Sequence, residues 1–270
     1  MMKFGAEAYT WFMKDSGAAH ANSVGRMIDI SADAGFTGVE PIFGWMGDYA
    51  DPGRLKEKLD ASGIELAAIA FGQDWNQPEE TAEERDLADQ AIAFLKQFPD
   101  AMLCTVQLPT GRHDLEQRRL NLVNNINAVS RRAADAGVPA TYHPNSPATS
   151  TNRTEEDYKI ILEGLDSAVT GWTPDVGHIQ NGDMDPLTIM KQYASLINLV
   201  HFKDWDGEHE FALMGQGKID FVSITKWLIQ QNFDGWVICE DEAPQALDDP
   251  DGVTLHDGRW IHDTLLPAST

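Results

Sequence analysis

The sequence predicts a single-domain (β/α)8 barrel that spans residues 1–270. Short β-rich runs alternate with longer amphipathic segments eight times along the chain. The strand-like runs are almost continuously apolar, which is typical of parallel strands that are buried on both faces. Eight units in 270 residues give about 34 residues each, the size of one strand–helix step. A doubly wound open sheet is the competing fold, but no glycine-rich phosphate turn follows the first run at Tyr9.

Eight segments have the composition of strands. The third and fourth, ELAAIAFG and MLCTVQL, are the most continuously apolar, and the sixth, VTGWTPDVGH, is the least regular. Each is short enough for a strand and is followed by a segment with helical periodicity. We expect strands at residues 3–10, 38–43, 65–72, 102–108, 139–145, 169–178, 198–205 and 235–242.

The intervening segments are predicted to be helices, because capping residues and helix breakers stand at their ends. Thr81 with Glu84 three residues later has the spacing of a capping box. Prolines stand in the first turn of two segments, and glycines end several others. We expect helices at 23–34, 52–62, 81–97, 114–136, 154–164, 186–194, 220–231 and 255–265, with boundaries at Asn22 or Ser23, Gly35, Pro52, Gly63, Gly137, Gly164, Pro186 and Asp220.

The charge balance excludes several classes of partner. Twenty Lys and Arg residues against 43 Asp and Glu residues give a formal net charge of −23, which repels nucleic-acid phosphates and anionic lipid surfaces. Cys104 and Cys239 stand alone in apolar runs and are expected to be buried, reduced thiols. We find no secretory signal and no run of 18 apolar residues, so we expect a soluble cytoplasmic protein.

Four consecutive predicted strands end in side chains that bind metals. Catalytic groups of such barrels come from the carboxyl ends of the strands. His143, Asp175, His201 and Glu240 stand there, each roughly one strand–helix unit after the last. Two imidazoles and two carboxylates suit Mn²⁺, Co²⁺, Fe²⁺ or Zn²⁺ better than Mg²⁺. We therefore predict one divalent metal that acts as a Lewis acid on a carbonyl and a neighbouring hydroxyl. Strand alternation should turn Cys239 away from it.

Several motifs in the second half of the chain resemble one enzyme family. The stretches TYHPN, PDVGH, VHFKD, GQGKIDF and ICEDE, in this order, resemble the xylose-isomerase-like TIM barrel superfamily of sugar isomerases, epimerases and inosose dehydratases. The resemblance implies the same four metal ligands. It also implies that His178 contacts a substrate oxygen, and it matches Glu40 to an acidic residue at the end of the second strand.

One departure from the epimerase pattern favours a dehydratase. Many epimerases of the superfamily carry a glutamate where this chain has His143, and that glutamate works as one of two bases. With His143 in its place, we expect a β-elimination from a keto-inositol-like substrate. Glu240 or His143 would take the proton, and His178 or Lys203 would assist the departing hydroxyl. Epimerisation or aldose–ketose isomerisation of a sugar is the alternative. For Lys203 a simple ion pair with Asp204 that orients His201 is a further alternative.

Other residues near strand ends are typical of a site for a small polyol. Aromatic side chains there can cover the apolar face of a sugar or cyclitol ring, and polar ones can bond its hydroxyls. A homo-oligomer is an open alternative, because barrels of this kind often pair. The expected substrate contacts are Trp11, Glu40, Phe71, Gln107, His178 and Trp205, with Trp45, Trp75 and His113 in the same region.

Three other functions fit the sequence less well. Endonuclease IV, a DNA-repair relative on this barrel, needs further histidine ligands where Phe71 and Gln107 stand, and the net charge opposes DNA. A retaining glycosidase needs a carboxylate near the end of the fourth strand, where Gln107 stands instead. A non-catalytic sugar-binding homologue should have lost metal ligands, and this chain keeps all four.

Overall fold

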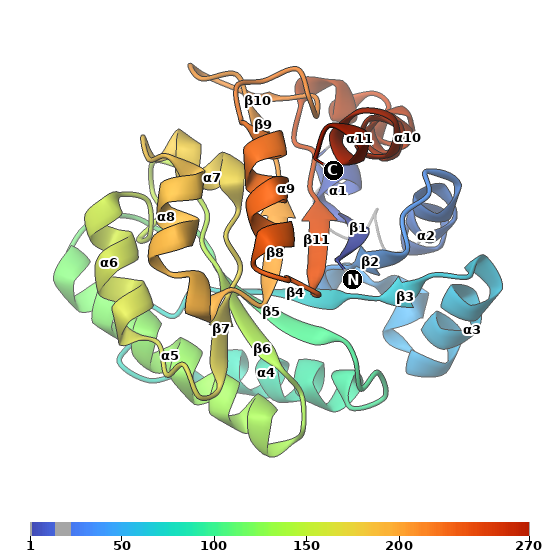
Figure 1. Ribbon diagram of the computed structural model, residues 1–270. Helices are drawn as coiled ribbons and strands as arrows, with labels where there is room; N and C mark the ends of the chain where they lie inside the picture. Colours follow the sequence, from blue (N-terminus) through green and yellow to red (C-terminus); the bar gives the residue numbers. More distant parts are fainter. Residues whose placement is uncertain (1, 14–22, 270) are drawn as a thin grey trace. The chain divides into compact units, whose positions relative to one another are not determined.

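The computed structural model describes residues 2–13 and 23–269, which form two compact units. The first unit comprises Met1–Ala67 with Val200–Thr270, and the second comprises Ala68–Leu199. Figure 1 shows that both are built from strands and helices in alternation. The single-domain boundaries stay a prediction, and a helix cap at Asn22 falls outside the described residues.

The first unit is organised around a five-stranded sheet with the order β3-β2-β1-β11-β8. The pairings of β1 with β2, β2 with β3 and β1 with β11 are all parallel. A short antiparallel ribbon, β9 with β10, follows β8. The strands are β1 (Lys3–Glu7), β2 (Gly38–Glu40), β3 (Glu65–Leu66), β8 (Leu199–Phe202), β9 (Asp204–Trp205), β10 (Phe211–Ala212) and β11 (Trp236–Cys239).

Helices connect these strands; α3 and α9 begin and end close to the predicted residues, whereas α10 begins at Pro250 instead of residue 255. In α3, Asp51 is the N-cap and its side chain accepts the Arg54 N–H, while Gly63 adopts a left-handed conformation (φ 70°) just past the end. Asp220 caps α9 in the same way. The helices are α1 (Tyr9–Phe12), α2 (Val24–Asp33), α3 (Pro52–Ser62), α9 (Phe221–Gln230), α10 (Pro250–Trp260) and α11 (Leu266–Ser269).

The second unit contains a parallel four-stranded sheet with the order β4-β5-β6-β7. Helices α4 and α5 pack against it, which Figure 1 shows at the lower side of the sheet. The predicted capping box of Thr81 and Glu84 is present at α4. The elements are β4 (Ala68–Gln73), α4 (Ala82–Leu95), β5 (Met102–Gln107), α5 (Leu115–Asp135), β6 (Ala140–His143), α6 (Glu155–Gly164), β7 (Thr170–Trp172), α7 (Val176–Asn181) and α8 (Pro186–Gln192).

Several predicted strands are shorter than expected, and in two of them a helical segment replaces the last part of the strand. The first was expected over residues 3–10, but it ends at Glu7 and residues 9–12 form a helical turn. The sixth was expected over 169–178, but β7 ends at Trp172. Asp175 then caps α7, because its carboxylate accepts the backbone N–H of His178 at 2.7 Å. That local hydrogen bond stabilises a helix start rather than an extended chain.

The cores explain the apolar runs of the sequence. The strand residues of β4, β5, β8 and β11 are almost all buried, as parallel strands covered on both faces require. Cys104 and Cys239 lie in these strands as reduced thiols outside any disulfide, 0% and 2% exposed. Burial raises the pKa of the Cys239 thiol well above its ordinary value. Both thiols are therefore packing residues, as predicted.

Candidate metal and proton-transfer site

His201 is the centre of a buried cluster in the first unit. It lies on β8 with 2% of its surface exposed. Its Nδ1 lies 3.0 Å from Oε2 of Glu240, which directly follows β11. Its Nε2 lies 3.0 Å from Oε2 of Glu40, the last residue of β2. The imidazole is thus held between two carboxylates, one on each ring nitrogen.

The cluster contains more carboxylates than the sequence analysis found. Glu7, the last residue of β1, is paired in register with Glu40 and is 3% exposed. Burial raises the pKa of Glu7 well above its ordinary value, and the charges of Glu240 and Glu40 raise it further. Burial alone would lower the pKa of His201, but Glu40 and Glu240 outweigh it and raise that pKa well above its ordinary value. The two carboxylates therefore favour a positive charge at this position.

Lys203 is bound to the same cluster. It is fully buried, and its Nζ lies 2.9 Å from Oε1 of Glu240 and forms a second ion pair with Glu242. The alternative of an ion pair with Asp204 is wrong, because the Asp204 carboxylate accepts backbone N–H groups instead. Gly217 is required beside it, since a Cβ there would lie 2.2 Å from Oδ1 of Asp204. Asp204 therefore orders the GQGKIDF loop.

The second unit places His143, Asp175 and His178 together. His143 ends β6, and its Nε2 lies 3.5 Å from Oδ2 of Asp175. Nε2 of His178 lies 4.0 Å from the same oxygen, and the two imidazole rings meet edge to face at 5.7 Å. All three side chains are at most 5% exposed. Oδ1 of Asp175 accepts the cap hydrogen bond of α7, so its other oxygen, Oδ2, faces both imidazoles.

A hydrogen-bond chain orients His178. Its Nδ1 lies 2.8 Å from the hydroxyl of Ser146, and that hydroxyl accepts the side-chain N–H of Asn181 at 2.8 Å. Because Ser146 already accepts one hydrogen bond, its own hydrogen can point to Nδ1. His178 then carries its proton on Nε2, on the side of Asp175. Ser146 and Asn181 were not found by the sequence analysis, since no local pattern marks them.

The expected substrate-contact residues of the first unit are buried by contacts within that unit. Trp11 is 6% exposed, and its indole N–H donates to Asp251 at 3.0 Å. Trp205 is 8% exposed and packs edge-on against Phe211 at 5.2 Å. Glu40 has no exposed area. The contacts of these side chains with a substrate stay a prediction.

In the second unit, Phe71 lies two residues before the end of β4, and Gln107 is the last residue of β5. Phe71 packs near Trp75, with ring centroids 6.2 Å apart, and the Gln107 amide donates to the Asp74 carbonyl at 3.0 Å. Trp75 has the unusual φ of 45°, and its backbone N–H is held by Glu84 at 2.7 Å. A strained, buried aromatic residue after a barrel strand is typical of a functional loop.

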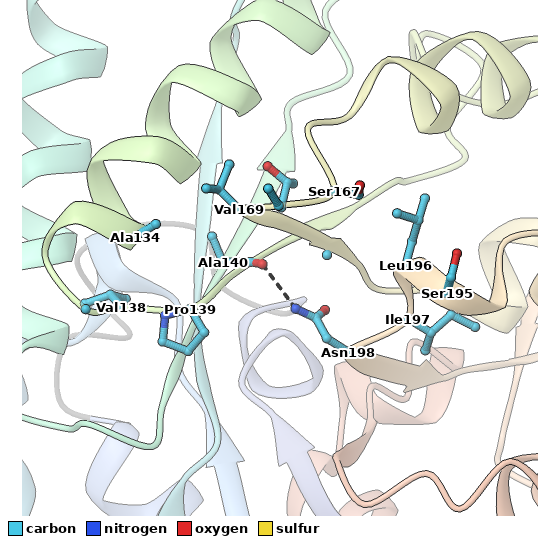
Figure 2. Close-up of a pocket in the computed structure, with 14 residues that line it drawn as sticks. Ala134, Val138, Pro139, Ala140, Ser167, Val169, Ser195, Leu196, Ile197 and Asn198 are labelled. Atoms are coloured by element: carbon cyan, nitrogen blue, oxygen red, sulfur yellow. Dashed lines mark hydrogen bonds between the residues drawn. The ribbon is translucent and has the colours of Figure 1, made fainter.

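A pocket of about 440 Å³ lies at the other end of the second unit's strands (Figure 2). It is formed by the segments before β6 and β7 and by residues 195–198. The side chain of Asn198 donates to the Ala140 carbonyl at 3.1 Å, as Figure 2 shows. All fourteen lining residues are uncharged. The pocket therefore offers no acid–base or metal chemistry. Residues at this end of a barrel contribute to stability rather than to catalysis.

Comparison with known proteins gives the chain its relatives. Residues 28–264 match the family described as "Xylose isomerase-like TIM barrel". The inosose dehydratase of Clostridium beijerinckii is 24% identical over 272 residues, which covers 89% of each chain. Other inosose dehydratases, from Clostridium botulinum and Lacticaseibacillus casei, match over only 53–55% of their length.

Solved structures with low identity share the fold. The IOLI protein with a bound zinc atom is 16% identical with a TM-score of 0.80, and 99% of each chain is covered. The probable 3-DHS dehydratase AsbF of Bacillus anthracis is 14% identical with a TM-score of 0.77, covering 97% of this chain and 100% of that one. Within residues 2–13 and 23–269, no helix has the length and apolar character needed to cross a bilayer. The predicted (β/α)8 fold is confirmed, and the chain belongs to the xylose isomerase-like TIM barrel family.

Proposed function

We propose that this protein is a divalent-metal-dependent lyase that removes water from a keto-inositol-type substrate. The observation that carries the proposal is a pair of buried imidazole–carboxylate contacts at strand ends, His201 with Glu240 in the first unit and His143 with Asp175 in the second. The relatives named inosose dehydratase support the substrate class. The fold is shared with a probable 3-DHS dehydratase, which supports the reaction type.

The four side chains of these two contacts are the proposed metal ligands. Since the strand ends of a (β/α)8 barrel carry its catalytic groups at one face, residues 143, 175, 201 and 240 would share one ion under this proposal. Their chemistry fits a divalent cation: two imidazoles and two carboxylates, all at most 7% exposed. Mn²⁺, Co²⁺, Fe²⁺ and Zn²⁺ suit this donor set, and Mg²⁺ suits it less. The ion would supply Lewis-acid polarisation of the substrate's carbonyl and hydroxyl oxygens.

The protein's own residues would move the protons. In the elimination a C–H bond beside the carbonyl loses its proton, a C=C bond forms, and the hydroxyl on the next carbon leaves as water, without any oxidant. Glu240 or His143 accepts the carbon-bound proton, and His178 or Lys203 donates to the leaving hydroxyl. Burial of these groups excludes solvent from the proton transfers. Sugar epimerisation or aldose–ketose isomerisation needs the same first step and keeps the hydroxyl.

Metal removal tests the proposal directly. The protein is stripped with EDTA, reloaded with Mn²⁺, Co²⁺ or Zn²⁺, and incubated with inososes and ketoses in D2O while NMR follows deuterium uptake and loss of the hydroxyl. We expect dehydration of an inosose only in the loaded protein. Full activity of the stripped protein would contradict the metal role, and deuterium uptake without dehydration would favour the isomerase alternative.

Variants separate metal binding from folding. We expect His201→Ala to lose stoichiometric metal while its circular dichroism spectrum is unchanged. His262→Ala is the matched control, because His262 lies at the surface and its side chain forms one hydrogen bond within the described residues, to the Gly35 carbonyl. A His201→Ala protein that retains its metal would refute the ligand assignment.

A further inference from the structure

Glu40 contacts His201 from a distant strand of the same sheet. In the order β3-β2-β1-β11-β8, strands β1 and β11 separate Glu40 on β2 from His201 on β8. Yet Oε2 of Glu40 lies 3.0 Å from Nε2 of His201, and Glu40 has no exposed area. Among the described residues, this is the one hydrogen bond of the Glu40 carboxylate, whose Oε1 is buried without a partner. The side chain is therefore committed to the imidazole.

The two sides of the imidazole are chemically different. Nδ1 faces Glu240, which is itself a proposed ligand, and Nε2 faces Glu40, which is not. An imidazole that binds a metal presents a lone pair on one nitrogen and keeps its proton on the other. A carboxylate can only accept a hydrogen bond, so the nitrogen beside Glu40 is the one that keeps the proton. Nδ1, on the side of Glu240, is left for the ion.

We infer that Glu40 is a positioning residue that accepts the Nε2–H of His201, fixes its tautomer and aims Nδ1 at the metal. This inference rests on the proposed metal site and replaces the expectation that Glu40 touches the substrate. Carboxylates that accept the second N–H of a metal-bound histidine orient the ring and increase its basicity, and their loss typically lowers metal affinity about 10- to 100-fold.

The test measures the tautomer and the metal affinity, not only turnover. In zinc-loaded wild-type protein, long-range ¹H–¹⁵N NMR should show His201 protonated at Nε2 and bound through Nδ1. Zinc titrations against a chromogenic chelator should show affinity about 10- to 100-fold weaker in Glu40→Gln, and a smaller loss in Glu40→Asp, which keeps the charge. Glu65→Gln, on the neighbouring β3 with an exposed side chain, should bind zinc like the wild type.

Three results would overturn the positioning role of Glu40. A wild-type His201 that carries its proton on Nδ1 overturns the inference without any variant, so it stays testable even if Glu40→Gln does not fold. Wild-type zinc affinity in a folded Glu40→Gln protein also overturns it, while the metal site itself stands. If the wild-type protein binds no divalent ion, the proposed function fails and this inference fails with it.

Discussion

Two buried clusters of charged side chains, one in each unit, are built on opposite electrostatic principles. In the second unit Asp157 is surrounded by cations: Arg112 bonds it at 2.8 Å and Arg119 bonds its other oxygen. In the first unit Glu7 and Glu40 lie with Glu240 around His201. The arginines around Asp157 compensate its negative charge, whereas the cluster around His201 brings several carboxylates together in one buried region.

The pKa values show the consequence of this difference. Burial alone would raise the pKa of Asp157, but hydrogen bonds from Arg112, from the backbone of Thr154 and Arg153 and from Arg119 outweigh it and lower that pKa. In contrast, burial and like charges raise the pKa of Glu7. The arginine contacts of Asp157 therefore stabilise the fold, and the repulsion of Glu7 by neighbouring carboxylates destabilises it. Buried carboxylates that crowd together at strand ends and have strongly shifted pKa values are typical of a functional site.

The largest effect is expected from removing the compensated carboxylate. Asp157→Ala leaves two partly buried guanidinium groups without their shared partner and removes the capping box at Thr154. We expect the free energy of unfolding to fall by about 3–5 kcal/mol, measured by urea denaturation. Asp60→Ala, in an exposed pair with Lys56, is the control and should change it by less than about 1 kcal/mol.

The same variant has a pH signature. A lowered pKa contributes stability above the unfolded-state pKa of about 3.9, and that stability is lost as the pH falls toward the lower folded-state pKa. Asp157→Ala should therefore lose less stability between pH 5 and acid than the wild type does. Parallel acid profiles for the two proteins would show that the guanidinium groups do not stabilise the ionised carboxylate.

A smaller and opposite effect is expected in the first unit. Glu7→Gln keeps the oxygen that accepts the Tyr9 N–H and removes a charge repelled by Glu240 and Glu40. We expect the metal-free variant to be stabilised by roughly 1 kcal/mol at pH 8, which raises Tm by about 2–4 °C. A raised pKa means that the wild type loses stability as the pH rises from about 4.3 through the folded-state pKa. The gain should therefore shrink toward pH 4.

The control for this variant is an exposed carboxylate of the same unit. Glu65→Gln should change Tm little across the same pH range, since the Glu65 side chain is half exposed. Calorimetry after EDTA treatment would measure the Tm of both variants and of the wild type. A Glu7→Gln protein that is less stable than the wild type at pH 8 would mean that the carboxylate makes a favourable contact which compensates for the repulsion.

Features encoded within a few residues were predictable from the sequence. The capping box of Thr81 and Glu84 and the end of α3 at Gly63 depend on neighbours in the chain, and both are present. The alternation of strands and helices predicted the barrel for the same reason. Asp175 was expected at the carboxyl end of the sixth strand, yet β7 ends at Trp172 and the Asp175 carboxylate caps α7. A helix of six residues leaves little periodicity to detect.

The predicted ligands His201 and Glu240 do lie in contact, but other contacts between distant residues were not predictable. Glu7 was missed because the first strand was expected to continue to Thr10, which hid the strand end that carries it. An ion pair of Lys203 with its neighbour Asp204 was one alternative from the sequence. Alternation along β8 and β9 instead turns the two side chains toward different partners. The register that sets Glu7 beside Glu40 depends on sheet order, which one sequence does not show.

The smallest effect concerns the neutral hydrogen bonds of the second unit and decides which unit supplies the acid. Ser146→Ala removes the hydroxyl between His178 and Asn181 at a cost of about 1 kcal/mol in stability. If His178 donates its Nε2 proton to the leaving hydroxyl, kcat should fall on the order of tenfold, part of the 10²–10⁴ that acid catalysis contributes, with metal content unchanged. The exposed Ser167→Ala is the control. An unchanged kcat would assign the acid to Lys203. The charged cluster of the first unit would then donate the proton to the leaving hydroxyl.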